Sequence, residues 1–242
     1  MTLFLTSSPC VPDADRAILN PANGFVDQLR SALPQGANCL FICSDPDSPE
    51  LTDHFAGEMA GAFEDADMAF SGIAVLDRRN QEEAAELIAW SGLIILAGGH
   101  VPTQNRFFRE IGLSGLLQDY TGIVMGISAG SMNSAGVVYA QPELEGESID
   151  PGYARWLPGL GLTDIHILPH YQQIWDAILD GRRLFEDITY ADSMGNTFFA
   201  LADGSYLYRA GESPEALYGE AYLIEDGRLT QIAEEGGITP LG

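Results

Sequence analysis

Residues 122–131 read Gly-Ile-Val-Met-Gly-Ile-Ser-Ala-Gly-Ser, a short apolar run that leads into a Gly-x-Ser-x-Gly motif. A strand, a tight turn and a helix in this order form the setting of a nucleophile elbow, which lifts a serine on a strained turn above the sheet edge. A Cβ atom at Gly126 or Gly130 would collide with the neighbouring strand or helix, which explains the two glycines. Small residues also form ordinary tight turns, but this context favours Ser128 as a nucleophile.

Upstream of this motif, apolar runs of strand length alternate with stretches of helix length. Residues 93–96 are continuously apolar, which is typical of a parallel strand covered on both faces. The alternation predicts an α/β fold with a doubly wound, mostly parallel sheet and right-handed crossovers. The expected strands are Leu3–Thr6, Cys39–Cys43, Gly72–Leu76, Leu93–Leu96 and the run before Ser128, and the expected helices lie near Ala22–Ala32, Ser48–Phe63, Gln81–Trp90 and Thr103–Gln118.

The final third of the chain changes character, because short strand-like segments replace the alternation. Asp203-Gly204 and Asp226-Gly227 punctuate these segments, and Asp-Gly between apolar runs predicts a hairpin. No linker separates this region, so we expect C-terminal antiparallel hairpin strands packed on the same domain, with residues 1–242 forming one domain. The segments are Asn196–Leu201, Ser205–Arg209, Ala221–Ile224 and Leu229–Ile232.

The charge balance excludes several functions. The 242 residues include 35 acidic and 11 basic side chains, for a net charge of −24, and every basic residue is arginine. Without lysine there is no Schiff-base lysine, no Ser–Lys dyad and no P-loop phosphate site. No basic stripe is present to bind nucleic acid. The first residues lack the features of a signal peptide and no apolar run could span a membrane, so we expect a soluble, cytoplasmic protein without a membrane partner.

The three cysteines carry no recognisable chemistry. Cys39 and Cys43 fall four apart on one predicted strand and therefore share a face, as small core residues would. Neither they nor Cys10 have a second cysteine or histidine at metal-ligand spacing. We expect no disulfide framework, no metal site and no cysteine nucleophile.

Four histidines are the candidates for a base that serves Ser128. His54 falls in a predicted surface helix, and His166 lies within the predicted strand 165–168, where a structural role is expected. His100 and His170 each follow a predicted strand, at the carboxyl edge of the sheet where open α/β folds place their sites. His170 is the predicted base, since it would lie at the same sheet edge as Ser128.

Two further roles need residues near Ser128 and His170. Gly98 and Gly99 follow a buried strand, so a backbone amide there could join that of Ala129 in an oxyanion hole. An acid that orients His170 is expected between the elbow and the histidine. Spacing does not choose among the candidates, which are Glu143, Glu145, Glu147, Asp150 and Asp164.

Three motifs together carry a family resemblance. Gly98-Gly99-His100, residues 126–131 and Leu168-Pro169-His170-Tyr171 occur in this order. The sequence resembles the dipeptidase E and cyanophycinase family of serine peptidases, over nearly the whole chain including residues 219–227. The resemblance implies a flavodoxin-like, class I glutamine-amidotransferase-like fold with serine at the elbow.

The resemblance also implies a role for each matching residue. Ser128 would be the nucleophile, His170 the base and Glu143 the triad acid, with the amides of Gly99 and Ala129 as oxyanion donors. The implied activity is that of a dipeptidase-like exopeptidase that hydrolyses small peptides through an acyl-enzyme. It needs neither a metal nor an organic cofactor, and a homodimer is one assembly that it allows.

Two departures from the family bear on the substrate. The usual Gly-Gly-Asn is Gly-Gly-His here, so His100 changes a polar contact near the substrate. Arg182 and Arg183 loosely match a segment that supplies an arginine for an acidic N-terminal side chain, and a guanidinium suits a carboxylate. Two adjacent arginines are also typical of a solvated face.

Other functions remain open from the sequence. An α/β-hydrolase esterase uses the same motif, but its histidine normally lies far beyond the serine, and no histidine follows His170 here. An esterase or amidase that uses the elbow serine on the present fold is a second reading. A non-catalytic ligand-binding member of the same fold is a third.

Overall fold

The computed structural model describes residues 1–241 and is built around an eight-stranded sheet. Its order is β16-β13-β12-β1-β5-β4-β2-β3, in which the five strands from β1 to β3 run parallel. The parallel strands are β1 (Thr2–Thr6), β5 (Ile123–Ile127), β4 (Leu93–Leu96), β2 (Asn38–Ile42) and β3 (Gly72–Leu76). Three antiparallel strands extend the sheet beyond β1, namely β12 (Tyr206–Ala210), β13 (Glu215–Tyr218) and β16 (Ile238–Leu241).

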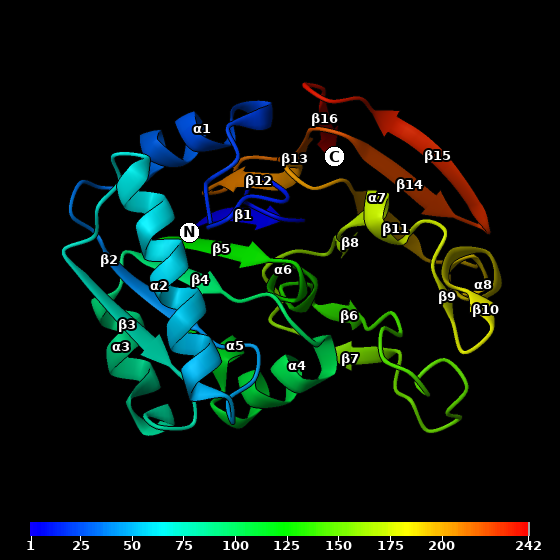
Figure 1. Cartoon of the computed structure of the whole chain (residues 1–242), viewed down its shortest axis with the longest axis horizontal. Coiled ribbons are helices and arrows are strands. Elements are labelled where there is room, and N and C mark those ends of the chain that lie inside the picture. Colours follow the sequence, from blue (N-terminus) through cyan, green and yellow to red (C-terminus); the bar gives the residue numbers. More distant parts are fainter. Residues whose placement is uncertain (242) are drawn as a thin grey trace.

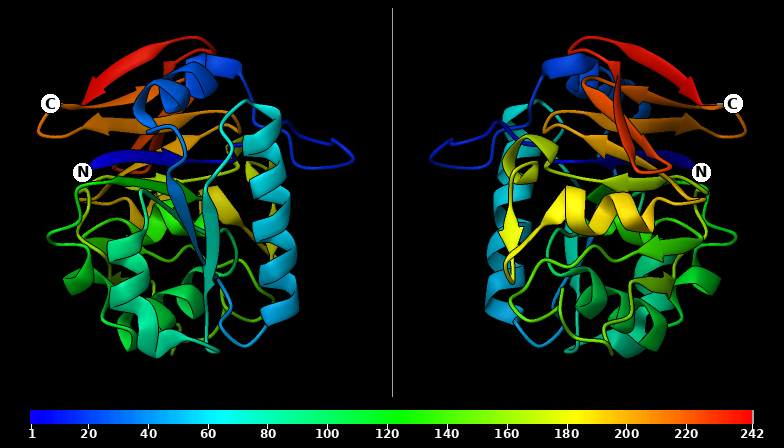
Figure 2. Two further views of the ribbon diagram at one scale, coloured as in Figure 1. Left: turned by 90° about the vertical axis from the view of Figure 1, so that its left-hand side faces the viewer. Right: turned by 90° about the vertical axis from the view of Figure 1, so that its right-hand side faces the viewer.

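Helices cover both faces of this sheet because successive strand residues point to opposite sides. On one face, Phe4 and Phe41 pack with the helices α1 (Phe25–Ala32) and α2 (Pro49–Asp65). On the other, Leu40 and Val124 pack with α3 (Ala84–Trp90), α4 (Val101–Glu110) and α5 (Leu113–Leu116). Figure 1 and the side view in Figure 2 show α2 and α3 on opposite sides of the strands. The doubly wound, mostly parallel α/β fold is thus confirmed.

A second, four-stranded sheet packs beside the first. Its order is β15-β14-β11-β8, and β8 and β11 are parallel while the other pairs are antiparallel. These strands and α6 (Ala129–Asn133) share a third apolar cluster that includes Met132, Leu168 and Phe198. The strand bounds are β8 (His166–Leu168), β11 (Thr197–Leu201), β14 (Ala221–Glu225) and β15 (Arg228–Ala233).

Short elements complete the chain. Two-stranded ribbons are formed by β6 (Val137–Tyr139) with β7 (Trp156–Pro158) and by β9 (Ile178–Leu179) with β10 (Arg182–Arg183). The remaining helical segments are η1 (Ala22–Gly24), η2 (Gln81–Glu83), α7 (Tyr171–Ile174), the π-helical η3 (Leu184–Thr189) and α8 (Tyr190–Asp192). Among the described residues no helix is long and apolar enough to cross a membrane.

Two expectations about local structure differ from the fold. The single helix expected near residues 103–118 is two helices, because Gly112 has φ +65° and breaks the chain between α4 and α5. Asp226-Gly227 forms the expected hairpin between β14 and β15. Asp203-Gly204 does not, since it connects β11 in the second sheet to β12 in the first. This crossing between sheets brings Asp203 to the site described next.

Candidate active site

Ser128 occupies the predicted elbow between β5 and α6. Its backbone has φ +50° and ψ −109°, a strained conformation for a residue with a side chain. A Cβ atom at Gly126 would lie 2.7 Å from the amide nitrogen of Ser131, and one at Gly130 would overlap the carbonyl of Leu96. Both glycines are therefore required by the close approach of strand and helix, as the sequence indicated.

The histidine that Ser128 contacts is His170. Its Nε2 lies 2.9 Å from Oγ of Ser128, although the two residues are 42 positions apart. His170 follows β8 and has φ +59° at the N-terminus of α7, which turns its ring back toward the elbow. The Oγ atom of Ser7, just after β1, accepts a hydrogen bond of 2.7 Å from the backbone nitrogen of His170.

Asp203 is the acid bonded to the other ring nitrogen. Its Oδ1 lies 2.7 Å from Nδ1 of His170 and accepts a second hydrogen bond of 2.8 Å from Ser7, while Gln173 donates to Oδ2 at 2.6 Å. The Asp203 side chain is 4% exposed. Burial alone would raise its pKa, but the hydrogen bonds from His170 and Ser7 and the charge of His170 outweigh it and hold the pKa below the usual value.

The expectation that Glu143 bonds to His170 is therefore not met. All the acids expected in this role precede His170 in the chain, whereas Asp203 lies 33 residues beyond it. The sequence did carry a signal, since Asp203 closely follows the apolar segment Asn196–Leu201. That segment pairs in parallel with β8, so both strands end at the same edge.

The loop that holds Glu143 forms a separate network around His100. Nε2 of His100 lies 2.8 Å from Oε1 of Glu147, and Nδ1 lies 2.8 Å from Oγ1 of Thr103. The other oxygen of Glu147 accepts hydrogen bonds from the backbone nitrogens of Glu143 and Leu144. Through Glu147, His100 thus holds this loop beside the N-terminus of α4.

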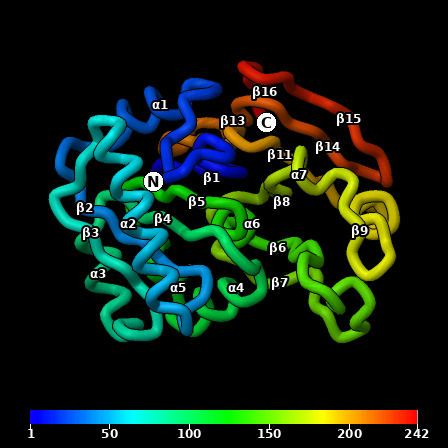
Figure 3. The backbone as a smooth tube through the Cα atoms, in the orientation of Figure 1, coloured from blue at the N-terminus to red at the C-terminus, as the bar shows by residue number. Residues whose placement is uncertain are grey.

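The same loop is also anchored to the turn between β9 and β10. The carboxylate of Asp180 accepts hydrogen bonds from the backbone nitrogens of Gly146 and Ser148, which lowers the pKa of Asp180. Figure 3 shows the loop after β6 and the β9–β10 turn as neighbours. The loop is accordingly held at three consecutive residues, because Glu147 bonds to His100 and its neighbours Gly146 and Ser148 bond to Asp180.

The carboxylate of Glu143 is in a different environment from that of a free surface carboxylate. The residue is exposed, yet enough protein surrounds its carboxylate for desolvation to raise its pKa. The charges of His100 and His170 oppose that rise, which places both imidazoles within electrostatic reach. Glu145 and Asp150 are exposed on the same loop.

The predicted oxyanion donors belong to the loop after β4 and to the start of α6. A Cβ atom at Gly98 would lie 3.4 Å from the Cβ of Ser128, so the loop after β4 contacts the elbow. A Cβ at Gly99 would meet the side chain of Ser44 at 2.5 Å, which limits this position to glycine. Ala129, the second predicted donor, begins α6 directly after the nucleophile.

The two predicted substrate arginines already have protein partners. Arg183 makes three hydrogen bonds to the carboxylate of Asp187. Arg182 donates one hydrogen bond of 3.3 Å to the carbonyl oxygen of Ser148, in the loop that follows Glu143. Of the two guanidiniums, that of Arg182 is held less strongly.

The remaining histidines and cysteines lie outside this site. His166 bonds to the carbonyl of Thr197 and packs against Trp156, in line with a structural role. Burial raises the pKa of Cys39 and of Cys43 to about 12, so both thiols stay protonated at neutral pH. Within residues 1–241, no group of three or more metal-binding side chains comes together.

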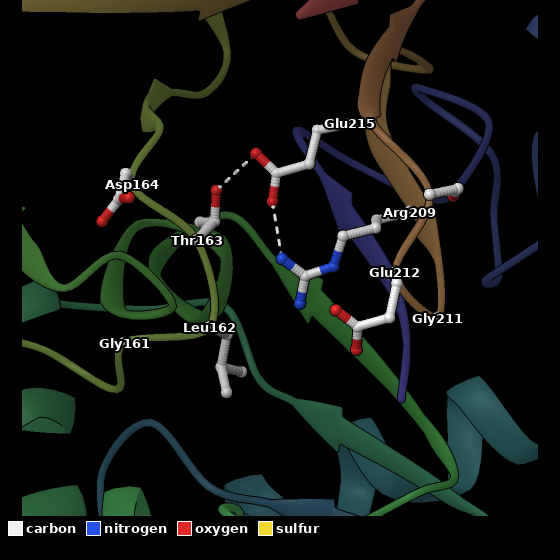
Figure 4. A pocket seen from close by; sticks show the side chains of 9 residues that line it. Gly161, Leu162, Thr163, Asp164, Arg209, Gly211, Glu212 and Glu215 are labelled. Carbon is white, nitrogen blue, oxygen red and sulfur yellow. Dashed lines mark hydrogen bonds and ion pairs between the residues drawn. The ribbon is translucent and has the colours of Figure 1, made fainter. Parts of the chain in front are cut away.

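A cavity of about 440 Å³ lies at the opposite edge of the sheet (Figure 4). Its wall residue Arg209 is paired with Leu3 near the amino end of β1, whereas Ser128 lies at the carboxyl end. Two of its polar side chains, Arg209 and Thr163, already donate hydrogen bonds to Glu215. We therefore locate the active site at the elbow and not in this cavity.

An elbow serine bonded to a histidine, at the carboxyl edge of a mostly parallel sheet, defines a class of serine hydrolases. The model of Peptidase family S51 matches residues 3–216. The chain therefore belongs to peptidase family S51 and is a hydrolase, a serine-type peptidase. The resemblance drawn from the three sequence motifs is confirmed.

Solved structures share the fold over almost the whole chain. A peptidase from an acI-B1 Actinobacterium superposes with a TM-score of 0.67 at 15% identity, covering 99% of this chain and 96% of its own. A protein described as peptidase E from Listeria monocytogenes EGD-e gives 0.58 at 16% identity, with 96% and 98% covered. A comparison with curated proteins finds no match.

Proposed function

We propose that this peptidase hydrolyses small peptides with Ser128, His170 and Asp203 as its catalytic triad. The observation that carries the proposal is the unbroken line of hydrogen bonds from Oγ of Ser128 through the imidazole of His170 to Asp203. A hydroxyl is a weak nucleophile unless a base removes its proton, and the base works best when a third group orients it.

The proposed reaction is acyl transfer. Nε2 of His170 accepts the proton of Ser128 as Oγ attacks the peptide carbonyl, and Asp203 stabilises the imidazolium that forms. The amides of Gly99 and Ala129 stabilise the negative oxygen of the tetrahedral intermediate. His170 then gives its proton to the leaving amine, and water activated by the same imidazole releases the acyl-enzyme.

Glu143 takes a different role in this proposal. A dipeptidase that releases the N-terminal residue must recognise the free α-ammonium group of its substrate, and a carboxylate supplies a charged partner for that group. Glu143 suits this role because its loop is held beside His100 and the charge of His170 acts on its carboxylate. In this proposal Glu143 binds the substrate ammonium group, and Asp203 is the triad acid.

A preference for an acidic N-terminal residue is the finer part of the proposal. Arg182 is its better candidate, since Arg183 is held by Asp187. The loop contact of Arg182 to Ser148 links it to the segment that presents Glu143. At Arg182 a substrate carboxylate would displace only the neutral carbonyl oxygen of Ser148, whereas at Arg183 it would have to displace the charged carboxylate of Asp187.

The proposal is tested by comparing Ala-Leu, acetyl-Ala-Leu and an alanine ester as substrates. A dipeptidase that binds the α-ammonium group cleaves Ala-Leu and loses most activity on the acetylated peptide, which lacks that group. Cleavage of the ester alone would instead support an esterase. Absence of turnover on all three, despite binding, would support a non-catalytic member of the fold.

A further inference from the structure

A second cavity, of about 240 Å³, is lined by residues next to the elbow. Gly98 and Ile127 form part of its wall, and both flank the nucleophile. Ile127 precedes Ser128 in the chain, and Gly98 approaches the Cβ of Ser128 as described above. We call this space the elbow cavity. It adjoins the serine that attacks the substrate, and no step of the triad uses it.

The walls of the elbow cavity are mainly apolar. Burial raises the pKa of Cys10 to about 11, so this thiol is neutral at physiological pH. Glu58 is the charged residue of the wall, and its carboxylate accepts a hydrogen bond from the backbone nitrogen of Ala17. The apolar side chains that line the cavity include Cys10, Phe41, Phe55, Met59, Ala97 and Ile127.

The elbow cavity lies at the edge of the sheet where this fold places ligands. Ala97 and Gly98 follow β4, Ile127 ends β5, and Cys10 belongs to the loop after β1. The same loop contains Ser7, which bonds to both His170 and Asp203. One loop therefore holds the triad in place and forms a wall of the cavity.

The size of the cavity suits one side chain. Pockets that enclose a drug-sized ligand measure about 300–1,000 Å³, and the elbow cavity is smaller than that. Phe55 of α2 is 48% exposed although it lines the cavity, so an apolar surface is available to an incoming group. A group inserted here would bury apolar area against both Phe55 and Met59.

We propose that the elbow cavity binds an apolar side chain from one of the two residues joined by the scissile bond. Gly98 and Ile127 line the cavity and both neighbour Ser128, so a side chain next to the attacked carbonyl is the part of the substrate that would enter it. The inference rests on the proposed peptidase function and adds to it the substrate class, dipeptides with an aliphatic or aromatic residue. Desolvation of the side chain drives its insertion.

The first test varies the substrate and the cavity together. For the unmodified enzyme, kcat/KM of either Leu-Ala or Ala-Leu is expected to exceed that of Ala-Ala by at least about tenfold, as burial of the extra carbon atoms requires. Ala17→Phe places a large group at the cavity from a half-buried loop position and should abolish the preference. Phe55→Ala removes a half-exposed wall and should weaken it.

Leu51→Ala is the matched control, since Leu51 is an exposed side chain of the same helix outside the cavity wall. It should leave the leucine preference unchanged. Equal kcat/KM for all three dipeptides in the unmodified enzyme would overturn the proposal. So would a preference that survives in both Ala17→Phe and Phe55→Ala.

A second measurement separates this proposal from the peptidase function. Calorimetric binding of the same dipeptides to Ser128→Ala should show tighter binding of one leucine peptide, and adding Ala17→Phe should remove the difference. Leucine-dependent binding without turnover in the unmodified enzyme would refute the peptidase function and support the cavity. Turnover without leucine-dependent binding would do the reverse.

Discussion

Asp203→Asn removes one charge from the candidate triad and is the sharpest perturbation of its geometry. The amide presents an NH₂ group where the carboxylate accepts hydrogen bonds from His170, Ser7 and Gln173. Asparagine therefore favours the tautomer of His170 that carries its proton on Nε2, which cannot accept the proton of Ser128.

The expected loss is about 10⁴-fold in kcat, which equals about 5.5 kcal/mol of transition-state stabilisation. A charged hydrogen bond contributes about 1.5–3 kcal/mol, so it covers only part of this loss. The rest of the loss comes from the wrong tautomer of His170 and from the missing negative charge, which water screens little because the Asp203 side chain is only 4% exposed. A merely structural contact would lower stability but leave kcat close to normal.

The assay is steady-state hydrolysis of Ala-Leu, with circular dichroism to confirm that the variant is folded. Glu143→Gln is the matched control, because it removes one carboxylate from the same site. It should raise KM by about fivefold, as expected for a partly screened charge pair, and leave kcat nearly unchanged. A severe loss of kcat in Glu143→Gln, together with a mild one in Asp203→Asn, would refute the reasoning.

Three further predictions concern stability and specificity. Gly130→Ala should lower the free energy of unfolding in urea by more than ~2 kcal/mol, because the added Cβ overlaps the carbonyl of Leu96. The control Gly57→Ala, on the open side of α2, should be neutral or stabilising by ~0.5–1 kcal/mol, and equal effects of the two variants would contradict the packing account. Folding lowers the pKa of Asp203, so the ionised carboxylate stabilises the protein above the usual carboxyl range, and this stabilisation is lost as the pH falls below about 3.8. The urea midpoint of Asp203→Asn should therefore fall less steeply with acid than that of the unmodified protein. Parallel pH curves for the two proteins would contradict an ionised Asp203 in the folded state. Arg182→Gln should lower kcat/KM for Asp-Leu and spare Ala-Leu, while Arg183→Gln should affect neither strongly; identical ratios in all three proteins would exclude an acidic preference based on Arg182.

The parts of the fold set by local pattern could be predicted from sequence. Alternating apolar and amphipathic segments fixed the parallel strands, because each strand must be covered on both faces. The glycines around Ser128 and the position of His170 after a strand located the nucleophile and its base. Each of these inferences depends on residues that are neighbours in the chain.

Asp203 could not be found by the same reasoning, because its role depends on contacts between distant segments. Its Asp-Gly sequence is typical of a hairpin, yet here it connects two sheets. Only the pairing of β11 with β8 brings the acid to His170, and strand pairing is not encoded in one local motif. The elbow cavity has the same origin, since α2, β4, β5 and the loop after β1 each supply part of its wall.

The central claim, that Ser128 is activated by His170 and Asp203, is tested most directly by covalent labelling with a fluorophosphonate and mass spectrometry of the digested protein. We expect a single adduct on Ser128, absent in Ser128→Ala and formed far more slowly in His170→Ala and Asp203→Asn. An adduct on another serine, or labelling of Ser128 at the same rate in all three proteins that retain it, would contradict the claim.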